Sequence, residues 1–515
     1  MVTKKHQSDV VMAKAFIVNP SHKDLRQFTA QMENAHTTVY GNYDVFTRVD
    51  SRSTSSTYIV TDEPEKHRGH QTMSRNEYAK IVALQEGYIR DQEMIVIDGY
   101  ISNAPEVQTA ARLIIEKRNA NVAGMQKFLY FPREGGEPTV TVIDTPNLVA
   151  EGYPNDRCIT VDMENNITRV LNSDYFGESK KGGLRMWNKI VYDKGGLPMH
   201  AGAKLVQTEQ GPKTIVIIGL SGTGKTTSTF RKQGKESKPV QDDFIALMPG
   251  GIVHGTENGC FAKTFGLATA TEPEIYGAVT SPIAYLENVY MDQDGNLDFF
   301  NESFTQNGRG VFPLEALGRY EDARNLPPVS AIVILNRARA VVPALARLSQ
   351  QQAAAYFMLG ETQGTSAGGK DEAGKALRVP GTNPFFPLPH DVQGNRFLQL
   401  LRTHPIEVYL MNTGWIVDDQ GPGSKKVTIE HSSHCLQAIA EGGVTWTDDL
   451  DFGYGVAEHL PGISTEDEDL LQPKKAFERL GRVDEYDAWV QKLRAERRAF
   501  LKTFPDLDPY ILDGI

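Results

Sequence analysis

The most constraining feature of this 515-residue sequence is a glycine-rich loop that directly follows an apolar, β-branched run. The run occupies residues 214–218, and the loop over residues 219–227 reads Gly-Leu-Ser-Gly-Thr-Gly-Lys-Thr-Thr. Such a run is typical of a buried strand, and the loop satisfies the GxxxxGK[ST] pattern of a P-loop. Glycines let backbone N–H groups turn towards one point, where they can hold phosphate oxygens. A strand, this loop and a helix are therefore expected in succession.

We expect the loop to bind a nucleoside triphosphate, and ATP in particular. Lys225 can reach the outer phosphates, and the Thr226 hydroxyl can hold Mg²⁺. Asp242 and Asp243 follow another short segment at residues 238–241, and an acidic residue in this place binds the metal or its waters in P-loop enzymes. The order of strand, loop and Lys-Thr disfavours a chance glycine-rich turn. The predicted nucleotide-binding loop residues are Gly219, Leu220, Ser221, Gly222, Thr223, Gly224, Lys225, Thr226 and Thr227.

Length and composition limit the class of protein. A single hydrophobic core stops growing near roughly 250–300 residues, so we expect two or more domains. The net charge of −11 disfavours a general nucleic-acid binder. No apolar run approaches the roughly 20 residues that cross a bilayer, and residues 1–11 lack the apolar segment of a secretory signal. Cys158, Cys260 and Cys435 form no CxxC pair, which fits a reducing cytoplasm.

Strand-like and helical segments alternate along the chain, which predicts an α/β fold. A Gly- and Pro-rich stretch at residues 195–198 indicates a boundary between an N-terminal α/β substrate domain, 1–196, and a C-terminal P-loop domain, 197–515. Residues 364–381 are rich in Gly, Ala and Lys and predict a mobile loop, interpreted as a lid. Strands are expected at residues 58–60, 94–98, 128–131, 139–143, 204–206, 214–218, 244–247 and 330–335, and helices at 105–118 and 485–504.

A series of sequence blocks, in order along nearly the whole chain, resembles the ATP-dependent phosphoenolpyruvate carboxykinases. A P-loop alone points only weakly to this family, whereas the ordered set is specific. The resemblance implies a two-domain carboxykinase-like α/β fold with the P-loop in the C-terminal domain. Besides the P-loop and the Asp-Asp pair, the blocks are Tyr175-Phe-Gly-Glu-Ser-Lys-Lys-Gly-Gly, Met199-His-Ala-Gly-Ala, Gly259-Cys-Phe-Ala-Lys, Glu272-Pro-Glu-Ile-Tyr, Leu286-Glu-Asn-Val, Asn307-Gly-Arg and Asn412-Thr-Gly-Trp.

The resemblance implies that Lys181, His200 and Asp243 bind a catalytic Mn²⁺, in addition to the Mg²⁺ at Thr226. A lysine can bind a metal only as the neutral amine, because an ammonium group has no lone pair. A nearby divalent cation must therefore depress the lysine pKa. Taken alone, His200 fits a hydrogen-bonded core histidine, and Lys180-Lys181 fits an ordinary exposed pair. Only the family resemblance favours a functional role for these residues.

The resemblance also assigns residues to the acceptor, oxaloacetate. Arg52 would bind its carboxylate and CO₂ through the planar guanidinium fork, Tyr175 would lie beside phosphoenolpyruvate, and Arg309 would offset charge on the transferred phosphoryl group. The catalytic set implied in this way is Arg52, Tyr175, Lys180, Lys181, Ser221, Lys225 and Arg309. Further nucleotide-binding residues implied are Asp242, Glu272, Lys426, Val427 and Ser432.

The sequence departs from the family pattern at both substrate ends. Residues 54–57 read Thr-Ser-Ser-Thr where the family has Pro-Lys-Asp-Lys, so two positive charges near the carboxylate are absent. Gly308 replaces a threonine before Arg309, and the 364–381 loop diverges from the usual lid. Lys426 stands where the family has an arginine, and lysine cannot stack a planar cation on a base. The phosphoryl-transfer residues are complete, so the departures fall on substrate recognition.

We therefore expect a cytoplasmic, monomeric enzyme that converts oxaloacetate and ATP to phosphoenolpyruvate, CO₂ and ADP, with no nucleic-acid or membrane partner. Decarboxylation would yield an enolate that attacks the γ-phosphoryl group. One alternative is a kinase of the same fold that phosphorylates another small acceptor without decarboxylation, which the altered residues 54–57 favour. Another is a nucleotide-sensing protein that has lost turnover. A carboxykinase using GTP or pyrophosphate is disfavoured, because those relatives have a different P-loop sequence.

Overall fold

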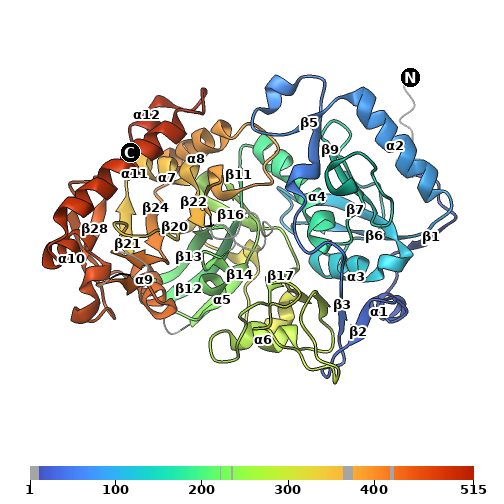
Figure 1. The fold of residues 1–515 in the computed structure, drawn as a ribbon, viewed down its shortest axis with the longest axis horizontal. Helices are drawn as coiled ribbons and strands as arrows, with labels where there is room; N and C mark the ends of the chain where they lie inside the picture. The colour runs from blue at the N-terminus through green and yellow to red at the C-terminus, as the bar shows by residue number, and fades with distance from the viewer. Residues whose placement is uncertain (1–10, 221, 234–235, 364–374, 418–420, 422) are drawn as a thin grey trace.

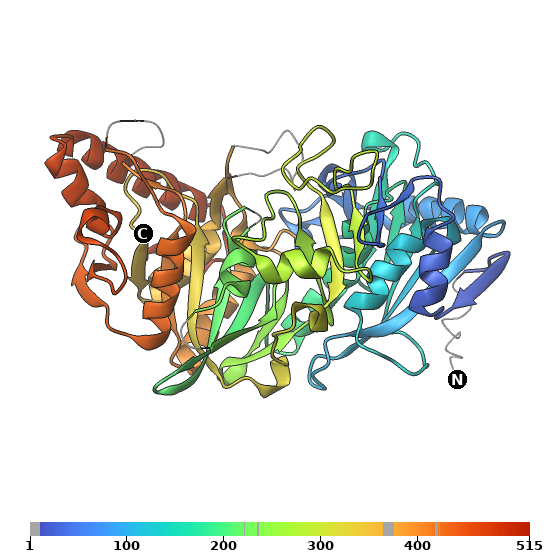
Figure 2. The same cartoon turned by 90° about the horizontal axis from the view of Figure 1, so that it is seen from below.

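Helices and sheets alternate along the chain in the computed structural model, which describes residues 11–220, 222–233, 236–363, 375–417, 421 and 423–515. Figure 1 shows the blue and cyan N-terminal segments on one side of the molecule, the orange and red C-terminal segments on the other, and green strands between them. The same separation is seen after a 90° rotation (Figure 2). The predicted α/β class is confirmed, and the division at residue 196 stays a prediction.

The first large sheet is mixed and comes from the N-terminal part of the chain. Its strand order is β1-β6-β7-β8-β10-β9-β4-β5. The strands expected at residues 58–60, 94–98 and 139–143 fall within it. Its strands are β1 Ala15–Val18, β4 Thr57–Val60, β5 Thr72–Met73, β6 Glu93–Ile101, β7 Thr109–Glu116, β8 Val140–Thr145, β9 Cys158–Asp162 and β10 Ile167–Leu171.

The helix expected at residues 105–118 is wrong, because this segment contains strand β7. β7 pairs antiparallel with β6, where Leu113 lies opposite Ile97, and parallel with β8 on its other side. Most of its side chains are buried. A strand buried on both faces has a nearly continuous apolar run, whose spacing does not distinguish it from a buried helix.

The strand expected at residues 128–131 is also wrong. Phe128 and Leu129 end helix α3, which spans Ala120–Leu129, and Phe131 makes only an isolated bridge with Tyr100. Helix α3 packs on the first sheet and on the third sheet described below. Tertiary packing therefore extends the helix through residues whose local preference favours a strand.

The second large sheet contains the strand that leads into the P-loop. Its order is β14-β12-β13-β20-β24-β21-β28-β27, with β13, β20 and β24 parallel. The strands expected at residues 204–206, 214–218 and 330–335 lie in β12, β13 and β20. Its strands are β12 Ala201–Thr208, β13 Gly211–Ile218, β14 Glu236–Gln241, β20 Val329–Asn336, β21 Leu345–Leu348, β24 Glu407–Asn412, β27 Thr445–Asp448 and β28 Gly455–His459.

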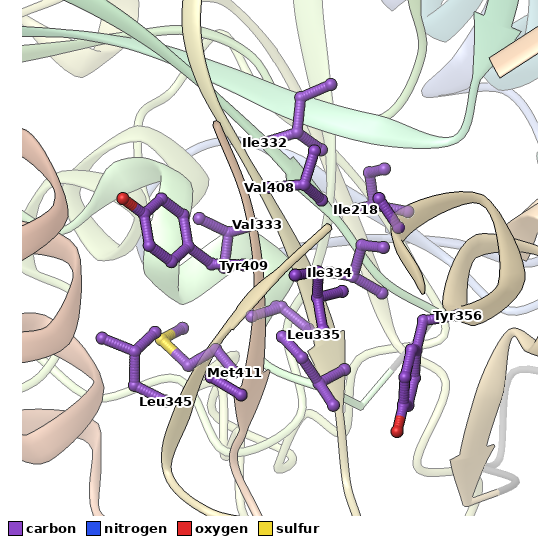
Figure 3. Close-up of a cluster of buried hydrophobic side chains, with 14 of the residues drawn as sticks. Ile218, Ile332, Val333, Ile334, Leu335, Leu345, Tyr356, Val408, Tyr409 and Met411 are labelled. Carbon is purple, nitrogen blue, oxygen red and sulfur yellow. The ribbon is translucent and has the colours of Figure 1, made fainter. Parts of the chain in front are cut away.

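The core of this sheet holds β13 in place from both faces. Val333 of β20 lies opposite Tyr409 of β24, and Figure 3 shows these two side chains together on one side of the strands, with Tyr356 of helix α7 (Gln350–Leu359) on the other. Ile218, the last residue of β13, is fully buried. Full burial of one such aliphatic side chain stabilises by about 1.5–3 kcal/mol, so the start of the P-loop is firmly anchored.

A third sheet joins segments that are far apart in the sequence. Its order is β17-β19-β18-β3-β2, and β3 pairs parallel with β18, placing Val45 opposite Glu287. Residues of both halves also share one hydrophobic cluster, in which Trp187 lies with Phe244 and Tyr285. The strands are β2 Ala35–Thr37, β3 Tyr43–Val45, β17 Gly259–Lys263, β18 Tyr285–Glu287 and β19 Arg309–Pro313.

The remaining elements complete the fold around these sheets. No helix among the described residues is both long and apolar enough to cross a bilayer. The small sheets contain β11 Leu197–Met199, β15 Ile245–Met248 and β16 Ile252–Gly255; β22 Glu361–Gln363 and β23 Ala376–Arg378; and β25 Trp415–Ile416 and β26 Lys425–Lys426. The helices not yet named are α1 His22–Thr29, α2 Arg75–Ile89, α4 Phe176–Asp193, α5 Lys225–Phe230, α6 Pro273–Val279, α8 Asp391–Thr403, α9 Ile429–Glu441, α10 Pro473–Arg479, α11 Val483–Leu501 and α12 Pro509–Leu512.

Two further predictions meet the described elements in different ways. The helix expected at 485–504 is α11, and the strand expected at 244–247 is β15. Within the loop predicted at 364–381, the structure has strand β23, and residues 364–374 lie outside the described residues. Strand β23 forms a two-stranded ribbon with β22.

The contact between β12 and α5 gives a test of how the fold positions the P-loop. A Cβ at Gly202 on β12 would lie 2.1 Å from the Oγ1 atom of buried Thr229 on α5. We expect Gly202→Ala to lower the free energy of unfolding by about 1–3 kcal/mol, because the close-packed helix must move. A shift of the urea midpoint measures this change, and triphosphate affinity should fall with it.

Gly87→Ala on α2 is the matched control, since a Cβ there meets no atom within 4 Å. It should stabilise by roughly 0.5–1 kcal/mol through the ordinary helix preference for alanine. Equal unfolding midpoints for the two variants would contradict the close-packing argument.

Candidate active site

A cavity of about 340 Å³ opens where the P-loop, helix α4 and the third sheet meet. It brings together most of the predicted site residues. Those that line it are Arg52, Tyr175, Lys181, His200, Leu220, Gly222, Gly224, Lys225, Thr226, Thr227, Asp242, Asp243, Glu272 and Arg309. Ser221, predicted in both the catalytic and the nucleotide sets, lies outside the described residues.

The phosphate-binding loop has the backbone that its glycines permit. Gly222 and Gly224 have φ of +84° and +93°, values that disfavour residues with a Cβ. Gly219 has no room for a Cβ, which would lie 2.4 Å from the Thr223 hydroxyl. That hydroxyl donates to the Leu220 carbonyl at 2.7 Å. The loop thus runs from the end of β13 to α5, which begins at Lys225.

The carboxylate of Asp243, whose side chain is 16% exposed, is the centre of the site's electrostatics. Lys180 lies 2.7 Å from Asp243 Oδ2, Lys181 contacts the same oxygen, and His200 Nε2 lies 3.0 Å from Oδ1. Lys225 of the P-loop lies 3.7 Å from Oδ1. Burial opposes ionisation, but Lys180 and Lys181 outweigh it and hold the pKa of Asp243 well below its usual value. Asp243 is therefore an anion that joins α4 to the P-loop region.

The two lysines of α4 differ in charge because their surroundings differ. Lys180 also pairs with Glu257 at 3.0 Å, and the two carboxylates outweigh burial and raise its pKa. For Lys181, burial outweighs the attraction of Asp243, and neighbouring Lys180 adds repulsion, so the pKa falls to about 7. Near neutral pH, Lys180 is thus an ammonium ion, while Lys181 has a neutral amine form with a free lone pair.

His200 is arranged as a ligand for a cation. Burial, with the nearby Lys225, lowers its pKa to about 4, so the ring is neutral. Its Nδ1 lies 3.0 Å from the Thr382 carbonyl and its Nε2 lies 3.0 Å from Asp243. A neutral imidazole has one N–H and cannot donate to both. With the proton on Nδ1, the Nε2 lone pair faces a carboxylate, and a divalent cation held by Nε2, Asp243 and Lys181 fits this donor set.

A second place for a cation lies at the P-loop. The Thr226 hydroxyl donates to Asp242 Oδ2 at 3.2 Å, and Asp242 Oδ1 is buried with no hydrogen-bond partner among the described residues. Burial raises the Asp242 pKa to about 6, although Lys225 opposes this. Thr226 and Asp242 thus present oxygens of the kind that Mg²⁺ prefers. No described cluster contains three or more His, Cys, Asp or Glu side chains suited to a metal, so substrate oxygens and water would complete either shell.

The predicted acceptor-binding residues come from three segments linked by Asn307. Its side-chain amide donates to Tyr175 Oη at 3.3 Å and to the Asp50 carbonyl. Its Oδ1 accepts from Arg309 Nη2 at 2.8 Å. The Arg309 guanidinium also lies over the Phe261 ring, 4.8 Å from its centroid. Asn307 thus links Tyr175 and Arg309 to the backbone two residues before Arg52, and Arg52, Tyr175 and Arg309 all line the cavity.

The altered residues 54–57 are not among the residues that line this cavity. Residues Thr54–Ser56 form a 3₁₀ turn. The Ser56 hydroxyl donates to the Pro154 carbonyl at 2.7 Å, and the Thr57 hydroxyl to the Ser53 carbonyl at 2.9 Å. Their hydroxyls thus stabilise the loop that carries Arg52, rather than replacing the missing positive charges in the cavity.

The predicted base-binding residues lie in a second cavity of about 650 Å³, which shares Gly222, Gly224 and Thr227 with the first. Lys426, Val427 and Ser432 line it. The Lys426 ammonium lies 5.7 Å from the centroid of the Trp415 ring. At the boundary between the two cavities, the Thr227 hydroxyl donates to Glu272 at 2.9 Å. The second cavity is thus continuous with the phosphate loop.

Several residues of the site had not been predicted individually. Phe261 and Lys263 belong to a block quoted for the family resemblance, which was the signal for them, and burial, with nearby Arg309, lowers the Lys263 pKa to about 8. Glu257 comes two residues before that block. Ile275 also belongs to a quoted block, and Leu377 and Val379 lie in the loop predicted at 364–381. Phe265, Thr362 and Phe385 had no such signal. The unpredicted lining residues include Phe261, Lys263, Phe265, Ile275, Thr362, Leu377, Val379 and Phe385.

Comparison with known proteins gives a consistent result. The family model described as phosphoenolpyruvate carboxykinase, in its ATP form, matches residues 14–466. Three similar curated proteins are named phosphoenolpyruvate carboxykinase (ATP). One from Aeropyrum pernix is 33% identical over 76% of this chain and 78% of its own length. One from Bradyrhizobium sp. strain BTAi1 is 32% identical over 65% and 63%, and one from Geobacillus kaustophilus is 27% identical over 98% and 97%.

Asp243→Asn tests the cation site, because it removes the charge while keeping the size of the side chain. We expect Mn²⁺ affinity to fall by at least about tenfold, as losing one metal-orienting group commonly does. Electron paramagnetic resonance of free Mn²⁺, titrated with the purified full-length chain, measures the affinity.

The matched control is Glu257→Gln, which removes the other carboxylate paired with Lys180 and leaves His200 and Asp243 in place. Its Mn²⁺ affinity should change much less. Equal losses in the two variants would show that the cluster acts only through its total charge, against the assignment of Asp243 as a ligand.

Proposed function

The chain belongs to the ATP-dependent phosphoenolpyruvate carboxykinase family, and from this premise we propose that it converts oxaloacetate and ATP to phosphoenolpyruvate, CO₂ and ADP. The observation that supports this reaction best is the shared cavity. Lys225 and Thr226 of the phosphate loop line the same cavity as Arg52, Tyr175 and Arg309. Phosphoryl transfer needs donor and acceptor held in line at short range, so one continuous cavity suits it.

At the phosphate end, the loop residues Gly219 to Thr227 bind the triphosphate, and Lys225 neutralises charge on the outer phosphates. We propose Mg²⁺ at Thr226 and Asp242, and Mn²⁺ at Lys181, His200 and Asp243. When bound, these cations supply Lewis-acid stabilisation of negative oxygens.

At the acceptor end, Arg52 binds a carboxylate of oxaloacetate through its guanidinium fork. The buried Tyr175 and the Phe261 ring cover the reacting carbons. Carbon–carbon cleavage releases CO₂ and leaves an enolate, whose oxygen attacks the γ-phosphorus. Arg309, held by Asn307, offsets the charge that develops on the transferred group.

The charge state of the lysines on α4 suits these steps. Lys180 pairs with Asp243 and Glu257 and favours the ionised form of both carboxylates, and it is not among the residues that line the cavity. Lys181 lines the cavity and has a pKa of about 7. We propose that its amine nitrogen is the third protein ligand of the Mn²⁺ site, beside His200 and Asp243.

The alternative of a kinase for another acceptor rested on residues 54–57. The hydroxyls of Ser56 and Thr57 bond to the carbonyls of Pro154 and Ser53, so these contacts give no support for a different acceptor. The first test is therefore direct: the purified chain with ATP, Mn²⁺ and Mg²⁺ should form phosphoenolpyruvate only when oxaloacetate is present, measured by ³¹P nuclear magnetic resonance. ATP turnover with other acceptors, but none with oxaloacetate, would establish the alternative.

Compartment and assembly are proposed on narrower grounds. The three cysteines are free and buried, which fits the reducing conditions of a cytoplasm. The monomeric state stays a prediction.

Arg52→Ala should lower the rate of phosphoenolpyruvate formation by at least about 100-fold, because the acceptor loses its orienting group. Arg52→Lys should recover only part of it, since an ammonium ion lacks the bidentate fork. ATP affinity, measured by isothermal titration calorimetry, should stay within about twofold, because the P-loop is unchanged.

Arg90→Ala, at the exposed end of α2, is the control and should match the wild type in both measurements. An Arg52→Ala enzyme with wild-type turnover, or one that loses ATP binding to the same degree as activity, would contradict the assignment of Arg52 to the acceptor.

A further inference from the structure

The C-terminal helix α11 lies behind the β22–β23 ribbon, whose front lines the active-site cavity. Thr362 of β22, Leu377 of β23 and Val379 just beyond it line that cavity. Successive side chains of a strand point to opposite faces. Glu361 and Arg378, the residues that alternate with them, contact α11 instead. The ribbon therefore connects the cavity wall to the C-terminal helix.

The strongest of these contacts is the ion pair between Glu361 and Arg497. Arg497 Nε donates to Glu361 Oε1 at 3.0 Å and its Nη2 donates to Oε2 at 2.8 Å, a two-pronged arrangement. The Arg497 side chain is 1% exposed and that of Glu361 14%. Glu361 also accepts from Arg378 at 3.2 Å and from Asn336, at the end of β20, at 3.4 Å. Bidentate guanidinium–carboxylate pairs fix orientation as well as contact.

Arg497 is itself held in one position. Its Nη1 donates to Tyr356 Oη on α7 at 3.0 Å. Its guanidinium lies 5.0 Å from the centroid of the Tyr356 ring and 5.4 Å from that of Phe452. Removing one partner of a buried pair is strongly destabilising, because it leaves an uncompensated charge. Arg497 therefore cannot shift without disturbing Glu361.

A displacement of Glu361 would reach the cavity through the backbone. Gly360, which ends α7 and precedes β22, has φ of +49°, and a Cβ there would lie 1.7 Å from the Val379 carbonyl oxygen. Val379 N donates to the Gly360 carbonyl at 3.1 Å. The two strands are thus in direct backbone contact where the ribbon begins, and Val379 moves with Glu361.

We propose that Arg497 is a positioning residue for the active site, which acts through Glu361 to hold Thr362, Leu377 and Val379 as one wall of the cavity. The inference rests on the proposed function. Leu377 and Val379 provide an apolar surface that excludes water from the enolate, so that the enolate is phosphorylated and not protonated to pyruvate. Arg497 lies beyond residue 466, where the match to the family ends.

The test compares Arg497→Met, Glu361→Gln and Arg498→Met in the full-length chain. Arg498 is the matched control, because it is the next residue of α11, is exposed, and donates only to the Ile515 carbonyl among the described residues. Phosphoenolpyruvate and pyruvate are measured together at saturating oxaloacetate and ATP. Hydrogen exchange of residues 376–379 reports the ribbon independently of activity.

In Arg497→Met, the kcat for phosphoenolpyruvate should fall at least about tenfold, because a small displacement in an active site costs that much or more. The KM for ATP should change less than about threefold, because the phosphate loop is untouched. The ratio of pyruvate to phosphoenolpyruvate should rise, and residues 376–379 should exchange faster. Glu361→Gln should change both readouts in the same direction, Arg497→Lys should restore part of kcat, and Arg498→Met should match the wild type.

Folded Arg497→Met protein with wild-type kcat and product ratio would overturn the inference, even if exchange quickens, because Arg497 would then only brace the fold. If Arg497→Met does not fold, Glu361→Gln decides by the same criteria. If the wild type forms no phosphoenolpyruvate, the proposed function fails. The inference is then judged on exchange alone: faster exchange in Arg497→Met than in Arg498→Met supports it, and equal exchange overturns it.

Discussion

One largely enclosed negative charge, that of Asp243, determines how the rest of the site can be arranged. An uncompensated charge in a protein interior costs several kcal/mol, so the groups that surround Asp243 must supply positive charge or a cation. Lys180 and Lys181 lie on α4, and Lys225 lies on the P-loop. His200 is the single residue between β11 and β12. The same carboxylate therefore joins α4 to the phosphate-binding region.

The division of charge between neighbouring lysines follows from this arrangement. Glu257 gives Lys180 a second carboxylate, which raises the Lys180 pKa. Burial and the neighbouring Lys180 charge lower the pKa of Lys181. Lys180 is therefore an ammonium ion that pairs with the two carboxylates. Lys181, with a pKa of about 7, has a neutral amine form near neutral pH. A neutral His200 ring has one N–H for its two contacts, which supports the proposal that a divalent cation binds at His200 and Asp243.

Much of this site could be predicted because it depends on ordered local blocks. The P-loop has its own pattern, and Lys181 and Asp243, 62 residues apart, were paired through the family resemblance. The helix expected at 105–118 was wrong because β6 and β8 enclose that segment, and only tertiary contacts distinguish such a strand from a buried helix. The Glu361–Arg497 pair spans 136 residues. No periodicity or spacing encodes a contact of that range, so the rear support of the cavity wall required the structure.

We propose that Asp243, His200 and Lys181 hold a cation facing an acceptor bound by Arg52. A crystal structure of the full-length chain with Mn²⁺, an ATP analogue and oxalate, a stable mimic of the enolate, tests it most directly through the anomalous signal of manganese. We expect the manganese peak within about 2.5 Å of His200 Nε2, an Asp243 oxygen and Lys181 Nζ, with oxalate within hydrogen-bond distance of Arg52. Manganese bound elsewhere, with His200 and Asp243 still in direct contact, would contradict it.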